Sequence, residues 1–517
     1  MKRLLLIASV TFATNLMAGN GVNWFSAIEN YTEFGASSVT SVLAYADSSI
    51  LIAGKFATCT EQPEGADFLG EKLIGAPFTP TMSQTNNNLV IAKVKRTGEV
   101  VWMIHSDRGN GEAVAVPTAD GGALVFASMT HTQKNALGDN YVLRMKHQDE
   151  ELCSAKRDYD GVNTIQYGFV LRVTKDGKAS VSAEISNTGD NKNAFGAINW
   201  ASDGTNYYLL LNDTAAMKVN ETTITPENGG SMVVLTFDQD GNYQGERHSS
   251  GQAVNSRSGQ LVCTKNALYA ATVVNADDLQ HIGIYSWSLT SDAAACGYVR
   301  GALDNDKNII QVKALYVDED EQTAYIAGGL NGGLKIGEDT LHQISEKLVP
   351  FIAKYDLEKA EAVAGYFHES TGIGGASAIF ERKDTLYVYE YDWGTQSGNR
   401  IRLEALNTAL EPLKEIGLLN TQAMEVTKDA ILASDDIVFN INTGKGATLS
   451  FVADPNITLT TPAISGFVAS VKVFVSEEPQ GITATEARPS DVRKVLRNGQ
   501  VLIIRDNKEY TILGQEK

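Results

Sequence analysis

Phe351-Ile-Ala-Lys-Tyr355 is a short apolar segment with one cationic residue, and variants of it recur along the chain. The variants are Leu89-Val-Ile-Ala-Lys-Val94, Phe169-Val-Leu-Arg-Val173, Met232-Val-Val-Leu-Thr-Phe237 and Phe467-Val-Ala-Ser-Val471. Runs of β-branched and aromatic residues followed by a tight polar turn, such as Arg96-Thr-Gly98, are typical of strands in β-hairpins. A pattern that returns along the chain indicates a repeat architecture.

Each unit of the repeat contains four strands, of which this segment is the third. Seven units begin with a recurrent pair of strands, at Val39–Lys55, Glu112–Ser128, Phe195–Leu211, Gly259–Val274, Val312–Gly328, Ala376–Tyr389 and Ala423–Ser434. Their spacing of roughly 45 to 85 residues includes and exceeds the usual period of propeller blades. We therefore predict an all-β fold, a β-propeller of seven four-stranded blades over residues 19–475. Six and eight blades are the alternatives, because units four, six and seven match the repeat poorly.

The last unit lacks a clear fourth strand, and a matching strand lies at the other end of the chain. Val22–Ile28 leads into the first unit as Val100–Ile104 leads into the second, with Trp24 in the place of Trp102. We predict that this N-terminal strand completes the last blade and closes the ring. Closure removes the unpaired strand edges that an open array would leave.

Two long inserts separate the second and third strands of the first two units, at Thr58–Asn88 and His131–Tyr167. Loops after the second strand of each blade emerge on one side of a propeller. We expect both inserts to enlarge that face, where variable loops often carry recognition.

The first residues have the pattern of a secretory signal peptide. Met1-Lys2-Arg3 precedes an apolar run from Leu4 to Met17, and Ala18 follows as a small residue at the cut. We predict that residues 1–18 are removed and that the protein is exported to the periplasm, the cell surface or the medium. No later stretch has the length and apolarity of a transmembrane helix.

The formal charge of −19 argues against nucleic acid as a partner, because a surface this acidic repels phosphates. The simplest role of this negative charge is to keep the protein soluble. We expect the protein to be a monomer.

Four cysteines in an exported chain favour disulfides. Cys59 and Cys153 lie in the two inserts of neighbouring units, and we predict a disulfide between them. Cys263 and Cys296 belong to the first and fourth strands of one blade, beyond the reach of a disulfide in a flat sheet. Their pairing is left open.

The chain changes character near residue 475. Residues 476–491 contain Pro479, Gly481 and Pro489 among polar residues and are predicted to form a linker. Residues 492–517 hold two or three short strands, which we predict to form a small C-terminal β-hairpin element. A hairpin docked on the propeller and a sorting signal are equal alternatives for this tail.

Four segments before the third strands also resemble one another: Phe68–Gly75, Met217–Ile224, Leu334–Leu341 and Ile457–Thr460. Together with the Phe351–Tyr355 pattern, they resemble the SBBP-type β-propeller repeats of secreted bacterial proteins. That family implies the fold and no defined chemistry. The tail, from Lys494 to Gly514, resembles the C-terminal tails read by the type IX secretion system of Bacteroidetes, which implies an origin in that phylum.

No motif in the sequence indicates a catalytic centre, a cofactor or a metal site. His105, His248 and His368 each close a fourth strand, so we expect them on the rim of separate blades, where one metal cannot bind them all. Among the aromatic residues, Trp393 at a strand end is the best candidate to stack on a sugar ring.

We therefore predict a non-enzymatic binding or scaffold propeller that recognises a glycan or a protein through loops on one face. The alternative is a carbohydrate-active enzyme, a hydrolase or lyase, with carboxylates at the central channel. Propellers do host such chemistry, but extending it to this chain is an analogy of fold and carries little weight.

Overall fold

The computed structural model of the 517-residue chain consists of strands and turns in the part that it describes, with no helix. The described residues are 21–30, 37–58, 64–75, 86–108, 113–129, 140–158, 167–187, 196–213, 216–225, 231–249, 254–277, 279–290, 294–302, 308–343, 347–368, 373–393, 399–421, 427–433, 436–443, 448–455, 457–460, 465–473, 493–497, 500–505 and 508–511. The predicted signal peptide, 1–18, lies outside them, and export stays a prediction. No helix of the described part is long and apolar enough to cross a bilayer.

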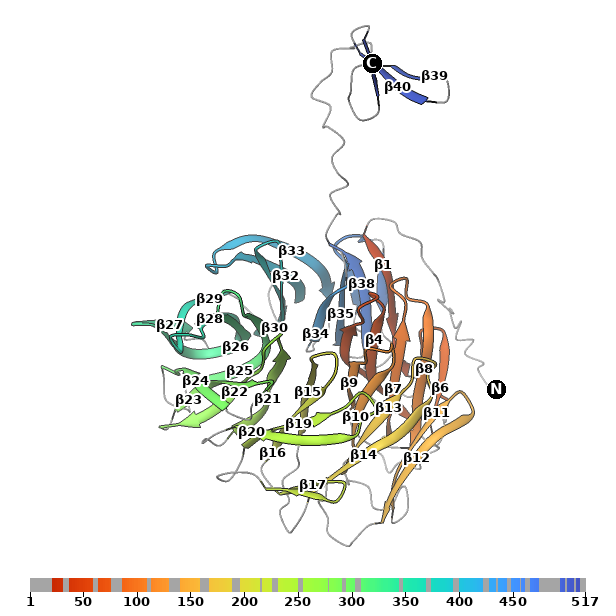
Figure 1. Cartoon of the computed structure of the whole chain (residues 1–517), viewed down its shortest axis with the longest axis vertical. Coiled ribbons are helices and arrows are strands. Elements are labelled where there is room, and N and C mark those ends of the chain that lie inside the picture. The colour runs from red at the N-terminus through yellow and green to blue at the C-terminus, as the bar shows by residue number, and fades with distance from the viewer. Residues whose placement is uncertain are drawn as a thin grey trace, which may run out of the picture. The chain divides into compact units, whose positions relative to one another are not determined.

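The chain divides into two compact units, Met1–Val473 and Phe474–Lys517. The first unit is a β-propeller of seven blades, each built on four antiparallel strands (Figure 1). The first strands of neighbouring blades contact one another around the ring. The predicted fold class and blade number are confirmed.

The first four blades follow the chain in order. Blade 1 contains β3 (Ser38–Ala44), β4 (Ile50–Thr58), β7 (Asn86–Val94) and β8 (Val100–Arg108); blade 2 contains β9 (Ala113–Pro117), β10 (Ala123–Met129), β13 (Tyr167–Val173) and β14 (Ala179–Asn187); blade 3 contains β15 (Gly196–Ser202), β16 (Tyr207–Asp213), β19 (Ser231–Phe237) and β20 (Tyr243–His248); and blade 4 contains β21 (Val254–Cys263), β22 (Ala267–Ala276), β23 (Leu279–Ser288) and β24 (Ala294–Val299).

The last three blades include the strand that closes the ring. Blade 5 contains β25 (Ile309–Asp318), β26 (Thr323–Ile336), β28 (Val349–Asp356) and β29 (Glu361–Phe367); blade 6 contains β30 (Ile373–Arg382), β31 (Thr385–Trp393), β32 (Asn399–Asn407) and β33 (Pro412–Thr421); and blade 7 contains β34 (Thr427–Ala433), β35 (Asp436–Thr443), β38 (Ser465–Lys472) and β1 (Val22–Ala27). In the seventh unit the prediction was wrong in detail, because the described part of Ala423–Ser434, residues 427–433, is a single strand. The apolar run of the second strand comes later, at Ile437–Ile441.

The recurrent third strands are apolar because blades stack on both of their faces. In β28 the side chains from Val349 to Ala353 are all buried, as expected for a strand covered on two sides. Even the cationic position is buried in blade 1. The ammonium of Lys93 lies 3.9 Å from the centre of the Tyr45 ring and donates to the carbonyl oxygen of Gly121 in blade 2 at 3.1 Å.

The ring closes through β1, as the sequence predicted. β1 pairs antiparallel with β38, with Ala27 opposite Phe467. Side chains of blade 7 also bind the backbone of blade 1: the Asn440 amide donates to the carbonyl oxygen of Val39 at 2.8 Å, and the Val39 amide donates to Oδ1 of Asn442 at 3.2 Å. An ion pair between Arg96 of blade 1 and Asp436 of blade 7 completes this junction.

Trp24 and Trp102 occupy the same place in successive blades. A Cβ atom on Gly98, whose φ is +83°, would lie 2.7 Å from Cγ of Trp24. A Cβ atom on Gly177, with φ +78°, would lie 2.8 Å from Cβ of Trp102. Each tryptophan of a fourth strand thus packs on the turn glycine of the next blade, where a side chain has no room and glycine adopts the positive φ without strain.

The inserts extend the outer edges of blades. Hairpin β11 (Asn140–His147) and β12 (Glu150–Asp158) belongs to the blade 2 insert and pairs with β8 of blade 1. The corresponding pieces of other units are β5 (Glu64–Phe68) and β6 (Glu71–Ile74), which pair with β2 (Glu29–Asn30); β17 (Met217–Val219) and β18 (Thr222–Ile224), on β14; β27 (Asp339–Gln343), on the end of β26; and β36 (Thr448–Phe451) and β37 (Thr458–Thr460), on β33.

The described parts of the two long inserts thus lie on the outer edges of blades, whereas we expected the inserts to enlarge one face. Their described parts are strands because their backbone groups find partners on an open sheet edge. A hairpin from one blade therefore caps the blade before it. Residues 59–63, 76–85, 131–139 and 159–166 of the inserts lie outside the described part of the chain.

His105 does not stand on an exposed rim, because β11 covers the edge of β8. The side chain is 3% exposed, and burial together with the charge of Lys146 lowers its pKa to about 4. The pKa of this histidine is lower in the folded protein than in the unfolded chain, where it is near 6.5. Its contribution to stability is therefore complete above pH 6.5 and is lost as the pH falls through the folded pKa.

Between pH 7 and pH 4.5, the free energy of unfolding should fall by about 2–3 kcal/mol more in wild type than in His105→Leu. Urea unfolding at both pH values measures the difference. Equal losses in the two proteins would contradict a buried neutral histidine at this position.

The second unit contains a three-stranded antiparallel sheet of β39 (Arg493–Arg497), β40 (Gln500–Arg505) and β41 (Lys508–Thr511). The predicted small β element is confirmed. Its role as a sorting signal stays a prediction.

Candidate functional site

The site residues predicted from the sequence fall largely outside the described side chains. Trp393 ends β31 with its backbone opposite Ile373, and its side chain is outside the described part. Cys59 is also outside it. Cys153 lies in β12, where burial with the nearby Glu151 charge raises the pKa of its thiol to about 11. The Cys59–Cys153 disulfide therefore stays a prediction.

Cys263 and Cys296 lie on β21 and β24, the two edges of the blade 4 sheet, and both are free thiols. Two intervening strands separate them, as the sequence indicated.

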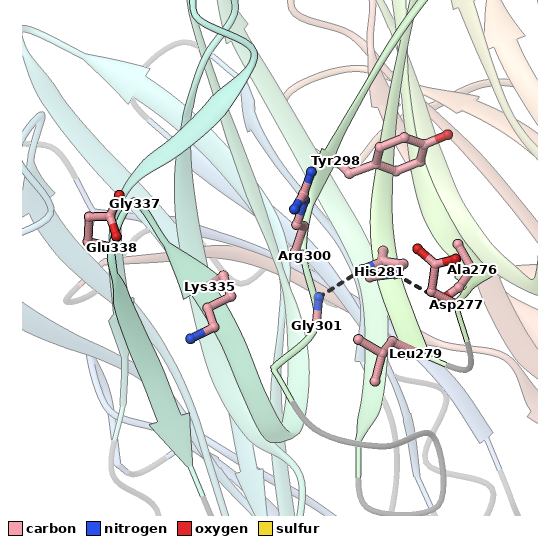
Figure 2. Close-up of a pocket in the computed structure, with 10 residues that line it drawn as sticks. All are labelled: Ala276, Asp277, Leu279, His281, Tyr298, Arg300, Gly301, Lys335, Gly337 and Glu338. Atoms are coloured by element: carbon pink, nitrogen blue, oxygen red, sulfur yellow. Dashed lines mark hydrogen bonds between the residues drawn. The ribbon is translucent and has the colours of Figure 1, made fainter.

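A pocket of about 540 Å³ opens where blade 4 meets the hairpin that blade 5 sends to its edge (Figure 2). β26 turns out of blade 5 at Gly332, whose φ is +136°. The amide of Ala302 donates to the carbonyl oxygen of Gly333 at 2.9 Å, and that of Lys335 donates to the carbonyl oxygen of Arg300 at 2.8 Å. These bonds attach the hairpin to the chain after β24 and form one wall of the pocket.

His281 holds the opposite wall in place. Its Nδ1 accepts the backbone N–H of Gly301 at 3.0 Å, so the ring is neutral and Nε2 carries the hydrogen. Nε2 in turn donates to the carbonyl oxygen of Ala276 at 3.1 Å. Figure 2 shows both bonds, which leave no ring nitrogen of His281 for a ligand and give this histidine a positioning role.

The remaining lining side chains combine two cations, two carboxylates and one phenol ring: Arg300, Lys335, Asp277, Glu338 and Tyr298. Arg300, Lys335, Asp277 and Glu338 are exposed, and Tyr298 is half-buried. Lys335 donates one hydrogen bond to Oγ1 of Thr340 at 2.7 Å and keeps two further donors. The wall therefore offers charged donors, charged acceptors and an aromatic ring within one cavity.

A second group of polar residues lies between blades 5 and 6. His368 follows β29 of blade 5, while Glu390 on β31 and Glu404 on β32 belong to blade 6. Nδ1 of His368 lies 3.7 Å from Oε2 of Glu390 and 3.6 Å from Oε2 of Glu404. One potential ligand atom from each residue lies within 4.8 Å of the others. We call these three residues the interblade cluster.

Arg402 binds the cluster from blade 6. Its Nη2 and Nε donate to Oε2 of Glu390 at 3.0 and 3.2 Å, and its Nη1 lies 3.8 Å from Asp392. The exposed fractions are 2% for Arg402, 3% for Glu390, 5% for Glu404 and 6% for Asp392.

Burial dominates the ionisation of this cluster. Desolvation raises the pKa of Glu390 to about 7, although the guanidinium of Arg402 opposes the shift. The neighbouring Glu404 carboxylate raises the pKa of His368 above its usual value. A histidine expected on the rim is thus part of a buried charged group.

The innermost strands provide little for acid–base chemistry at the channel. Among their described side chains, the acidic ones are Asp318 and Glu381, each at or next to the end of its strand beside a hairpin turn. The side chains of β34 lie outside the described part.

Sequence reasoning missed both sites for the same reason. The pocket needs a hairpin from one blade on the edge of another, and the cluster needs a histidine from one blade to face carboxylates of the next. The signal that could have found the cluster was the presence of charged residues, Glu390 in β31 and Arg402 and Glu404 in β32, in strands that also carry many apolar residues. Charged residues are rarely buried unless they are paired.

No family model matches the chain, and no curated protein matches it. Among solved structures it is similar to the β-propeller domain of the Trilobed protease from Pyrococcus furiosus, with 9% identity, a TM-score of 0.40, and coverage of 82% of this chain and 98% of that one. It is similar to the polysaccharide lyase Uly1 (8% identity, TM-score 0.44, 84% and 90% covered) and to a protein of unknown function from Dyadobacter fermentans (11%, 0.36, 88% and 100%). Likenesses at this level carry no inference about function, and the SBBP resemblance stays a prediction.

Proposed function

We propose that this protein is an exported, non-enzymatic binding propeller whose ligand is an acidic glycan, held in the pocket between blades 4 and 5. The observation that carries the proposal is the lining of this cavity by Arg300 and Lys335 together with Tyr298, Asp277 and Glu338. Its volume of about 540 Å³ is that of a site for a small ligand such as a short oligosaccharide.

The chemistry of the lining fits such a ligand. A sugar carboxylate or sulfate is recognised by guanidinium and ammonium groups, of which arginine gives the more directional contact. Carboxylates accept hydrogen bonds from sugar hydroxyls, and the edge or face of Tyr298 packs against the apolar side of a ring. The two cations come from different blades, so the ligand would bridge blade 4 and the hairpin of blade 5.

The enzyme alternative receives less support. A glycosidase needs two carboxylates facing the scissile bond, one of them with a raised pKa. In the pocket Asp277 and Glu338 are exposed on turns, and the described channel-side strands offer acids only near their ends.

We expect Arg300→Ala and Lys335→Ala each to weaken binding of an acidic oligosaccharide by about tenfold to a hundredfold, because each removes one charge-assisted contact. The probes are oligogalacturonate, sulfated chondroitin fragments and sialylated oligosaccharides, with maltohexaose as the neutral comparison. Thermal shift detects binding, isothermal titration calorimetry measures it, and chromatography of each mixture detects turnover.

Lys359→Ala is the matched control, since Lys359 is an exposed cation of blade 5 that pairs with Asp356 away from the pocket. It should bind like wild type. Equal losses in the Lys359 and Lys335 variants would show only a general charge effect. Turnover would favour the enzyme, and no binding of any glycan would move the proposal to a protein partner.

A further inference from the structure

We propose that His368, Glu390 and Glu404 form a binding site for one divalent transition-metal cation of the Zn²⁺ type, which joins blade 5 to blade 6. The inference is independent of the glycan pocket, which lies between blades 4 and 5.

The donor set has the identity and spacing that such a cation requires. Zn²⁺ is held by histidine nitrogen and carboxylate oxygen at about 2.0–2.2 Å, so that donors of a tetrahedral site lie about 3.4 Å apart. Nδ1 of His368 lies 3.6 and 3.7 Å from the two carboxylate oxygens, close to this spacing. Only small side-chain movements are needed to bring all three donors onto one ion.

Two of the three donor atoms are buried and lack protein partners. Neither Oε2 of Glu404 nor Nδ1 of His368 has a hydrogen-bond partner within the described structure. Glu404 is 5% exposed and its free oxygen points at the histidine nitrogen. A buried polar atom without a partner costs about 1–3 kcal/mol, and more for a charged group, so a cation bound between these two atoms would remove that cost.

The charge balance favours a doubly charged species. The buried carboxylates of Glu390, Asp392 and Glu404 carry three negative charges when ionised, and the guanidinium of Arg402 supplies one positive charge. The remaining charge of −2 is equal and opposite to that of a divalent cation. Both Arg402 bonds fall on Oε2 of Glu390, and a carboxylate has about four lone-pair positions, so this residue would bind the ion through its other oxygen, Oε1. Arg402 would then orient a ligand, as outer partners of metal ligands do.

The class of metal follows from the histidine. Ca²⁺ and Mg²⁺ prefer sites made of oxygen atoms alone, whereas imidazole nitrogen suits zinc and its neighbours in the first transition row. Three protein ligands leave a fourth position for water. The three ligands come from two blades, so a bound ion would fasten these blades together.

The competing occupant is a proton. A protonated His368 between the two carboxylates would reduce the same negative charge without any metal. The two possibilities differ in stoichiometric metal content and in the spectrum of a bound ion.

The test uses the full exported chain, stripped with EDTA and titrated with ZnCl₂ in a calorimeter, and separately with CoCl₂ while visible absorption is recorded. We expect one equivalent of Zn²⁺, a rise in melting temperature on binding, and Co²⁺ d–d bands typical of a four- or five-coordinate ion. His368→Ala and the near-isosteric Glu404→Gln should each weaken binding at least tenfold and abolish the Co²⁺ bands.

His248→Ala is the matched control, because His248 ends the fourth strand of blade 3 much as His368 follows that of blade 5. It should bind like wild type. Should His368→Ala fail to fold, Glu404→Gln carries the test, since it changes one oxygen to an amide group. Absence of stoichiometric binding, or equal binding by wild type, His368→Ala and Glu404→Gln, would overturn the proposal in favour of the proton.

Discussion

Trp24→Ala should lower the free energy of unfolding by about 3–5 kcal/mol, the usual cost of removing a large buried aromatic side chain. Trp24 is 8% exposed, packs in the core shared by blades 7 and 1, and donates from Nε1 to the carbonyl oxygen of Arg96 at 2.9 Å. Its loss leaves a cavity at the point where the two ends of the ring meet. Urea unfolding followed by circular dichroism measures the change.

Two comparisons separate packing from the hydrogen bond. Trp24→Phe retains much of the ring contact. It should lower the free energy of unfolding by about 1 kcal/mol for the lost hydrogen bond, and by a further amount because the phenyl ring is smaller. Trp102→Ala should cost about 1 kcal/mol less than Trp24→Ala, because Nε1 of Trp102 has no partner among the described residues. A Trp24→Ala protein as stable as wild type would show that the ring does not depend on this junction.

Arg402→Met should destabilise the metal-free protein by about 3–5 kcal/mol, because it leaves buried carboxylates without their cation. Arg402 is 2% exposed and is the hydrogen-bond donor to Glu390, with Asp392 3.8 Å away. Methionine fills a similar volume, so the decrease in unfolding free energy reflects the missing charge more than lost packing. The measurement is urea unfolding at pH 8 in EDTA, where a bound cation cannot mask the effect.

The double variant Glu390→Gln with Arg402→Met should recover much of that loss, since it removes one of the carboxylates that Arg402 neutralises. Arg400→Met is the matched control: Arg400 lies two residues earlier in β32 and is exposed, so its replacement should change stability by no more than about 0.5 kcal/mol. Equal effects at residues 400 and 402 would contradict a buried charge network.

The blades and the closure of the ring followed from the sequence alone. Segments such as Phe351–Tyr355 combine β-branched and aromatic residues with a polar turn, and these local preferences are strong enough to define strands and hairpins. Trp24 identified the closing strand because its place before the first unit repeats that of Trp102. Signals of this kind lie within a few residues of one another, so no tertiary contact is needed to detect them.

The tertiary structure alone decided where the inserts lie and which polar residues meet. Leu334–Leu341 was visible as a repeated segment, but its attachment to the edge of blade 4 depends on which neighbouring strand has free backbone groups. His368 was expected on the rim, yet it faces Glu390 and Glu404 across a blade interface. Side chains alternate between the two faces of a strand, so contact across blades depends on the register and stacking of whole sheets, which local sequence does not specify.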